Sequence, residues 1–137
     1  MDFAETFLDF AGVDIPEDMQ GRSFLPILKG STPADWRKTF YYHYYEFPGA
    51  HSVARHYGVT DGHYKLINFY ENKDWEMFDL TADPNELQSI YGRKEYVGVQ
   101  SRLEKELARL RKHYKVPMKD PDSTRPKPRR ERKNSKK

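Results

Sequence analysis

The residues best suited to bind an anion or a sugar lie in one short stretch, between Glu46 and Tyr57. Within seven residues this stretch offers two imidazoles, a guanidinium and a phenol, from His51, Arg55, His56 and Tyr57. A guanidinium presents a planar set of donors that suits sulfate, phosphate or carboxylate oxygens. Imidazole and phenol groups can hydrogen-bond to a sugar or stack on it. The stretch therefore predicts a site for an anion or a carbohydrate, and the alternative is a solvated loop.

Other familiar kinds of reactive or metal site are not indicated. Four of the five histidines lie between residues 43 and 63, but neither an HxH nor an HExxH pattern occurs. On one strand, His43 and Glu46 would point to opposite faces. The sequence has no cysteine, no G-x-S-x-G elbow, no phosphate-binding loop and no glycine-rich dinucleotide fingerprint. We therefore predict no catalytic residue and no metal ligand, and interpret these histidines as surface or half-buried residues of a sheet.

A small sheet would have to position the 46–57 stretch. Four segments rich in aromatic and β-branched residues predict strands, at residues 39–46, 56–60, 63–70 and 75–80. The pair Asp61-Gly62 is a strong hairpin signal, because it can supply the positive φ angles of a type I′ turn. Strands joined by such short turns form an antiparallel meander.

Helices are predicted before and after the strand segments in the sequence. Residues 95–114 carry apolar side chains at helical spacing, and this long helix is expected to cover one face of the sheet. Asp2 and Glu5 have the spacing of a capping box at the start of an N-terminal helix. Residues 83–87 predict a short helix with Pro84 at its first position. The expected fold class is α+β, a small antiparallel sheet of about four strands packed against a long C-terminal helix.

Charge is distributed unevenly along the 137 residues. Residues 117–137 contain nine Lys or Arg and three Asp or Glu, whereas residues 1–116 contain 15 and 18. The basic character thus belongs to a proline-rich tail that we predict to be disordered, and the chain as a whole is not expected to bind nucleic acid. No apolar stretch approaches the ~20 residues that span a bilayer, so no membrane partner is expected.

Several ordered segments closely resemble the C-terminal region of the type I, formylglycine-dependent sulfatases. Residues 2–13 and 16–28 resemble a stretch late in the large domain of that family. The segments RHYGVT, HYKLI, WEMFDL and DPNEL match its C-terminal subdomain in the same order, at residues 55–60, 63–67, 75–80 and 83–87. The resemblance covers residues 2–115 and is closest to bacterial-type sulfatases of sulfated amino sugars.

The resemblance implies an alkaline-phosphatase-like α/β domain followed by a smaller subdomain. Residues 1–37 would end the large domain, residues 38–116 would form the antiparallel-sheet and helix subdomain, and residues 117–137 would be the basic tail. The family hydrolyses sulfate esters with a calcium ion and a formylglycine made from Cys or Ser in a C/S-x-P-S-R motif. Here the one Ser-x-Pro, Ser31-Thr32-Pro33, continues into Ala34-Asp35. We therefore expect formylglycine and calcium in a missing N-terminal sulfatase domain, and expect the chain alone to be inactive.

The resemblance also assigns roles to residues. In relatives that act on sulfated sugars, the segment resembling residues 51–57 lies at the rim of the active-site cleft. His51, Arg55, His56 and Tyr57 are thereby candidates to contact a sulfated carbohydrate substrate. The chain would be the C-terminal fragment of a sulfuric ester hydrolase that braces this cleft. The alternatives are a noncatalytic module that binds sulfated glycans, and a small interaction protein whose basic tail binds nucleic acid.

Two further expectations follow. If residues 1–37 pack on a larger body, then Phe3, Phe7, Phe24 and Leu28 should leave an exposed apolar patch, through which the chain could form a homodimer. Members of the family are usually periplasmic, secreted or lysosomal, but the sequence itself assigns neither a compartment nor the sugar that would be the substrate.

Overall fold

The computed structural model describes residues 2–47 and 52–120. It divides into two compact units, Met1–Lys38 and Thr39–Lys137, each of which is described by itself. The division lies one residue from the boundary predicted between residues 37 and 38. No helix in the described ranges combines the length and the hydropathy that a membrane crossing requires.

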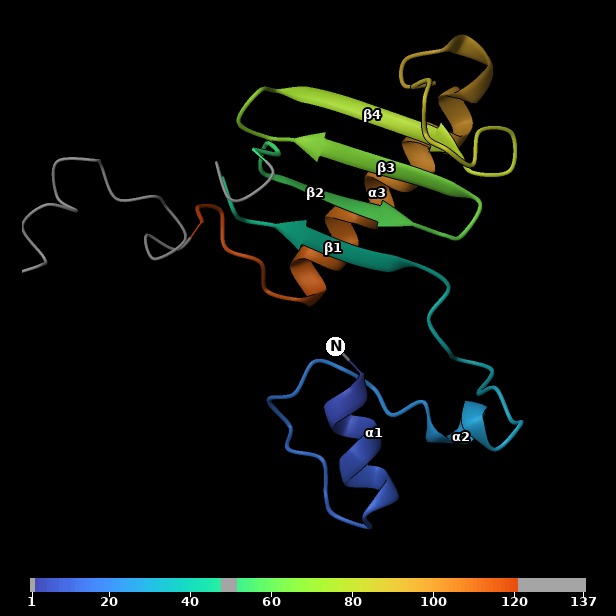
Figure 1. Cartoon of the computed structure of the whole chain (residues 1–137), viewed down its shortest axis with the longest axis vertical. Coiled ribbons are helices and arrows are strands. Elements are labelled where there is room, and N and C mark those ends of the chain that lie inside the picture. Colours follow the sequence, from blue (N-terminus) through green and yellow to red (C-terminus); the bar gives the residue numbers. More distant parts are fainter. Residues whose placement is uncertain (1, 48–51, 121–137) are drawn as a thin grey trace, which may run out of the picture. The chain divides into compact units, whose positions relative to one another are not determined.

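The second unit is a four-stranded antiparallel sheet with one long helix behind it (Figure 1). The strands follow the sequence order β1-β2-β3-β4, with bounds Phe40–Tyr44, His56–Thr60, Tyr64–Phe69 and Asp74–Asp79. A 3₁₀ turn, η1 (Lys94–Tyr96), leads into α3 (Val97–His113). This arrangement confirms the predicted sheet of about four strands packed against a long C-terminal helix.

Strand register explains how the sheet binds α3. Tyr41, Val59, Leu66 and Met77 are cross-strand neighbours, and all four are buried in the core. Because side chains alternate along a strand, this row points to one face, where it meets the apolar stripe of α3. That stripe consists of Leu103, Leu107 and Leu110.

On the opposite face of the sheet, a side chain of β1 lies very close to the backbone of β2. Tyr42 pairs with Gly58 in the register of β1 and β2. A Cβ placed on Gly58 would be 2.5 Å from the Tyr42 hydroxyl oxygen and from the Leu66 carbonyl oxygen. The phenol therefore occupies the space that a side chain at residue 58 would need.

The turn between β2 and β3 differs from the predicted type I′ turn. Gly62 has a positive φ of +87°, but Asp61 is not among the residues with positive φ, as a type I′ turn would require of both. Instead the Asp61 carboxylate accepts hydrogen bonds from the backbone N–H groups of His63 and Tyr64. The aspartate stabilises the turn through its side chain, so its own backbone stays outside the left-handed region.

The predicted short helix at residues 83–87 is wrong. The segment forms a turn in which Glu86 has a φ of +54°, a left-handed conformation that a helix cannot contain. Asp83 Oδ2 accepts a hydrogen bond from the Gln88 N–H instead of capping a first helical turn. Glu86 accepts a 2.6 Å ion pair from Lys65 on β3, which anchors this turn to the sheet.

The first unit contains α1 (Phe3–Phe10) and the four-residue α2 (Leu25–Leu28). The predicted capping box is wrong, because neither acidic side chain caps the helix. Glu5 Oε1 accepts a 2.7 Å hydrogen bond from the Gly21 N–H, and Asp2 accepts one from the Arg22 N–H and an ion pair from Arg37. The Asp2 and Glu5 carboxylates, which a capping box would use within the helix, instead bind the backbone at residues 21–22.

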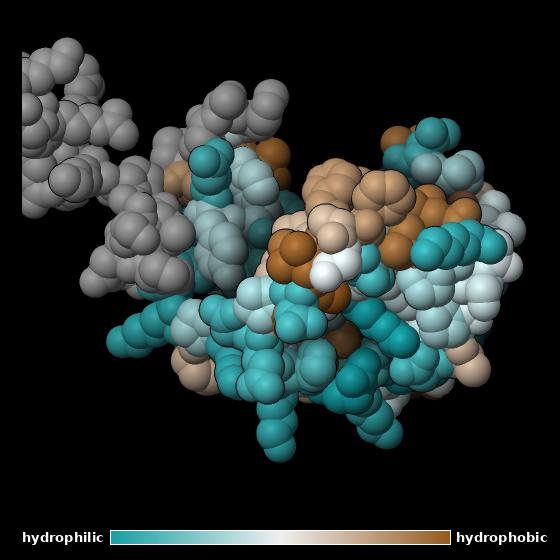
Figure 2. Space-filling view, turned by 90° about the horizontal axis from the view of Figure 1, so that it is seen from below, coloured by the Kyte–Doolittle hydropathy of each residue, from teal (hydrophilic) through white to brown (hydrophobic). Residues whose placement is uncertain are grey.

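Three phenylalanines of α1 are exposed at the surface of this unit, whereas the acidic Glu5 is buried. Glu5 is 2% exposed, whereas Phe3, Phe7 and Phe10 are 65%, 68% and 77% exposed. Leu28 in α2 is 67% exposed. Apolar side chains are visible on the surface in Figure 2. Three of the four residues predicted to form an exposed patch are thus exposed, and Phe24 is half-buried.

The chain after α3 remains in contact with the second unit as far as residue 120. Tyr70 donates a 2.6 Å hydrogen bond to Asp120 Oδ2, although residues 117–120 belong to the tail predicted to be disordered. Residues 121–137, the rest of that predicted tail, lie outside the described residues.

Candidate functional site

A surface cavity of about 390 Å³ lies beside the segment that the sequence singles out. We call it the edge cleft, and its lining includes His43 of β1, Tyr57 of β2, Tyr70, Arg111 of α3 and Asp120. These residues are far apart in the sequence, and the sheet and α3 bring them together.

Two tyrosine rings and one guanidinium form a layered wall of the cleft. The rings of Tyr57 and Tyr70 stack with centroids 5.4 Å apart and an angle of 16° between planes. Arg111 donates a 2.8 Å hydrogen bond from Nη1 to the Tyr57 hydroxyl, and its guanidinium carbon lies 4.1 Å from the Tyr57 ring centroid. Its Nε is buried and has no hydrogen-bond partner among the described residues. Arg111 therefore keeps a donor unused after its contacts with Tyr57.

His43 is a second buried group with an unused nitrogen. Its ring stacks on Tyr45, with centroids 3.8 Å apart, and its Nδ1 lies 3.1 Å from the Tyr41 hydroxyl. Its side chain is 7% exposed, and Nε2, which lies 3.8 Å from Asp120 Oδ1, has no hydrogen-bond partner within the described ranges. Burial lowers the pKa of His43, while the Asp120 carboxylate opposes that effect. Burial also raises the pKa of Tyr41 to about 12, so this phenol is neutral.

Asp120 closes one side of the edge cleft. It accepts the hydrogen bond from Tyr70, and burial followed by this contact raises the pKa of the Tyr70 phenol well above its usual range. Asp120 Oδ2 also lies 3.9 Å from Arg55 Nη1. The carboxylate thus lies near His43 and Arg55 and lines the cleft together with Arg111.

Of the four residues that the sequence proposes for substrate contact, the structure describes Arg55, His56 and Tyr57, and gives them different surroundings. Arg55 is 4% exposed and donates to the Tyr45 carbonyl at 2.6 Å and to Glu71 Oε1 at 3.0 Å. Its guanidinium is thus bound within the protein and positions Tyr45 and Glu71. Tyr57 lines the edge cleft, and His51 lies outside the described residues.

His56 lies on the other face of the sheet from Tyr57, as strand alternation requires. Its ring stacks on Tyr44 at 5.4 Å, and its Nδ1 lies 2.8 Å from the Ala54 carbonyl oxygen. Consequently Tyr57 and His56 cannot contact one small ligand in the edge cleft.

Sequence reasoning missed His43, Tyr70, Arg111 and Asp120 as members of one site. For Arg111 a signal existed, because it follows the buried Leu110 and lies four residues after the buried Leu107. That spacing places it at the margin of the sheet-facing stripe of α3. For Asp120 no local signal existed, since its segment has the composition of a disordered tail.

The edge cleft combines donors and acceptors. The Arg111 guanidinium suits the oxygens of an anionic group, while Asp120 and Glu71 can accept from hydroxyl or amino groups. Stacked phenol rings beside them offer an apolar surface. Across residues 2–47 and 52–120, no three His, Asp or Glu side chains are grouped so that they could hold a metal ion.

Comparison with known proteins matches most of the chain to one family of proteins. The family model for the C-terminal region of N-sulphoglucosamine sulphohydrolase matches residues 1–113. The chain is 54% identical over 125 residues to an N-acetylglucosamine-6-O-sulfatase of Bacteroides thetaiotaomicron, covering 89% of this chain and 22% of that protein.

Solved structures agree with this match. One, a complex of a protein with its substrate D-glucosamine-2-N,6-O-disulfate, superposes with a TM-score of 0.81 and 52% identity, over 85% of this chain and 24% of that one. A phosphonate monoester hydrolase from Silicibacter pomeroyi shares the fold, with a TM-score of 0.71 and 22% identity over 82% of this chain and 24% of the other. The chain therefore spans about a quarter or less of the relatives that it matches.

Proposed function

Because the chain belongs to the family of C-terminal domains of N-sulphoglucosamine sulphohydrolase, we propose that it works as part of a sulfatase for sulfated amino sugars. The fold is that of the C-terminal subdomain of an alkaline-phosphatase-like sulfatase, as the resemblance implied. The proposed substrate class is supported by one observation, which is the 54% identity to an N-acetylglucosamine-6-O-sulfatase. Since the chain spans 22% of that protein, the reaction belongs to a larger enzyme.

In this proposal the chain binds and positions substrate, and the nucleophile lies elsewhere. Hydrolysis of a sulfate ester needs a group that attacks sulfur and a cation that stabilises the sulfate oxygens. We expect the formylglycine and the calcium ion that supply this chemistry in an N-terminal sulfatase domain outside the chain. The sequence has no cysteine and no C/S-x-P-S-R motif, so we derive no catalytic step from its own residues.

The edge cleft is the part of the chain that we assign to sugar recognition. The Arg111 guanidinium in its lining suits sulfate or carboxylate oxygens. Its carboxylate, Asp120, suits the hydroxyl and amino groups of an amino sugar. Tyr57 contributes its phenol, while Arg55 acts as a positioning residue that fixes Tyr45, directly after β1.

The exposed phenylalanines of α1 support the second half of the proposal, that the chain packs against a larger catalytic domain. Phe3, Phe7 and Phe10 lie on one side of the helix, and all are more than half exposed. Apolar side chains at i, i+4 and i+7 on an exposed helical face indicate a surface that is buried by another part of the protein.

The test is a chimera. This chain replaces the corresponding C-terminal region of the N-acetylglucosamine-6-O-sulfatase of B. thetaiotaomicron, and hydrolysis of N-acetylglucosamine 6-sulfate is measured. We expect activity in the chimera and none in the isolated chain. Arg111→Gln and Asp120→Asn should raise KM several-fold, because each replaces a charged group of the edge cleft with a neutral amide.

Glu95→Gln is the matched control, since Glu95 is exposed and lies before α3. A chimera that is folded by circular dichroism yet inactive would contradict the proposed function. A chimera in which Arg111→Gln and Asp120→Asn have the same KM as the control would contradict the role of the edge cleft.

A further inference from the structure

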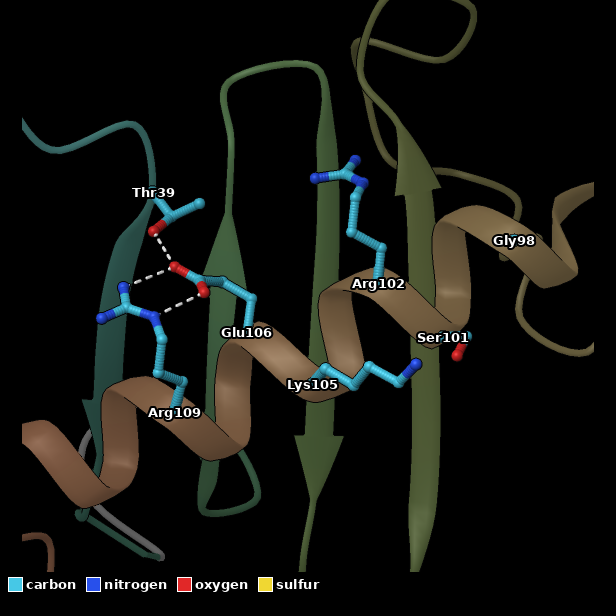
Figure 3. A pocket seen from close by; sticks show the side chains of 7 residues that line it. All are labelled: Thr39, Gly98, Ser101, Arg102, Lys105, Glu106 and Arg109. Carbon is cyan, nitrogen blue, oxygen red and sulfur yellow. Dashed lines mark hydrogen bonds and ion pairs between the residues drawn. The ribbon is translucent and has the colours of Figure 1, made fainter.

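The outward face of α3 carries a row of cations on the side away from the sheet. Arg102, Lys105, Arg109 and Lys112 are spaced three, four and three residues apart, so they share one side of the helix. All four are exposed, whereas Leu103, Leu107 and Leu110 between them are buried. At 1.5 Å per residue the row is about 15 Å long. Its first three members are drawn in Figure 3, with the sheet behind the helix.

A groove runs beside this row. A surface cavity of about 640 Å³ is lined by the three cations together with Gly98, Ser101, Thr39 and Glu106. A Cβ added to Gly98 would have no atom within 4 Å, so the end of the groove at that residue is open. We call these residues with Lys112 the α3 groove.

The cations of the α3 groove outnumber the carboxylates that face them. Arg102 donates to Asp61 Oδ2 at 2.7 Å. Arg109 binds Glu106 through Nε and Nη2, both at 2.7 Å (Figure 3). Even so, the side chains of Arg102 and Arg109 are 52% and 60% exposed. Lys105 and Lys112 form no ion pair or hydrogen bond with any residue in the described ranges.

Fixed arginines and free lysines together suit an extended anion. The ion pairs hold Arg102 and Arg109 in place, and leave Arg109 Nη1 and most of the Arg102 fork directed to solvent. A single compact anion would need converging donors, whereas these four cations form a line. A chain of regularly spaced anionic groups can contact several of them at once.

We propose that the α3 groove binds a linear sulfated glycan at a site distinct from the edge cleft. The choice of a sulfated glycan over another polyanion rests on the proposed function. It also rests on the side chains of the groove, which include no aromatic ring on which a nucleic acid base could stack. In the whole enzyme the groove would hold a polymeric substrate while one terminal sugar is processed.

The experiment measures binding of a size-defined heparin oligosaccharide to the full chain by isothermal titration calorimetry. The variant Lys105→Gln/Lys112→Gln is compared with the control Lys29→Gln/Lys73→Gln, which removes the same charge from exposed residues elsewhere. We expect about a tenfold loss of affinity in the groove variant at low salt, little loss in the control, and weakening of both by added salt. Both proteins keep residues 121–137, so a contribution of the basic tail cancels.

Three results would overturn the proposal. An equal loss in both variants would show that only net charge matters, and no binding by the unmodified chain would exclude the site. Equal affinity for single-stranded DNA of matched charge, with the same loss in the groove variant, would assign the groove to nucleic acid. In the chimera, the groove variant should hydrolyse the monosaccharide ester at the unchanged rate. The proposed function is therefore tested separately, because its failure abolishes that rate whether or not heparin binds.

Discussion

The Tyr42 phenol lies across Gly58 on the adjacent strand, in the place of the side chain that residue 58 lacks. The two residues are paired in the β1–β2 register, and the Tyr42 hydroxyl oxygen would be 2.5 Å from a Cβ on Gly58. This contact links β1 to β2. These two strands carry His43 and Tyr57, which line the edge cleft. Residue 58 is thus part of what keeps these two side chains in register.

Gly58→Ala should destabilise the chain by about 1–3 kcal/mol, because the methyl group would collide with the phenol and with the Leu66 carbonyl. Chemical denaturation monitored by circular dichroism measures this difference. The control is Gly98→Ala in α3, where no atom lies within 4 Å of the new Cβ and where alanine favours the helix. Equal stability of Gly58→Ala and the unsubstituted chain would show that Tyr42 can move away without cost.

Arg55→Ala should cost about 2 kcal/mol, since it leaves the Tyr45 carbonyl and the Glu71 carboxylate without their buried donor. The loss is below that for a fully buried ion pair because the Glu71 side chain is 42% exposed. Arg93→Ala, at an exposed residue, provides the comparison for thermal denaturation. A melting temperature for Arg55→Ala equal to that of Arg93→Ala would refute a structural role for Arg55.

His43 predicts a loss of stability in mild acid. Its pKa in the folded chain is lowered by burial, whereas in the unfolded chain it is about 6.5. Below that pH the unfolded chain takes up a proton that the folded chain excludes, so stability is complete above about pH 6.5 and falls as the pH decreases.

The groups that face the His43 imidazole give this prediction a control. The charges that act on the His43 pKa are those of Asp120, Arg111 and, from the other face of the sheet, His56, and only Asp120 favours the protonated ring. We expect an NMR titration to give a depressed pKa for His43, and Asp120→Asn to lower it further. His43→Gln should flatten the loss of stability between about pH 6.5 and 5. A pKa at or above the usual value would contradict the assigned burial.

A second loss of folding stability is expected at lower pH, because of Glu106. Its hydrogen bonds from Arg109, and the 2.5 Å bond from Thr39, lower the pKa of its carboxyl to about 2. The resulting stabilisation is present above about pH 4.3 and is lost as the pH falls toward 2. It should amount to about 1 kcal/mol at most, since Arg109 is largely exposed. Glu106→Gln should therefore reduce unfolding free energy at pH 7 and match the unsubstituted chain near pH 2; a difference that persists in acid would exclude this cause.

The sheet and α3 could be predicted because their patterns are local. The strand at 56–60 was predicted with its observed bounds, since an aromatic and β-branched run ends at a turn containing Asp61 and Gly62. Predictions that depended on the partner of one polar side chain were less successful. Glu5 has the spacing of a capping box, yet the Gly21 N–H, 16 residues away, is its donor.

The candidate site was only partly predictable for the same reason. Chain proximity grouped Arg55, His56 and Tyr57, but strand alternation and burial give them three different surroundings. Asp120 reaches the cleft through a hydrogen bond with a residue 50 positions earlier, and no local pattern encodes that distance.

The inverted arrangement of α1 has a practical consequence for protein engineering. Its acidic residues are constrained by short bonds to one turn, among them the 2.5 Å bond from Ser23 to Asp9, and a Cβ on Gly21 would collide with the Glu5 carboxylate. Phe3, Phe7 and Phe10 carry no such constraint from their own unit. Replacing them with charged residues should therefore improve the yield and handling of the isolated chain, and under the proposed function the same changes should prevent its packing against a catalytic domain.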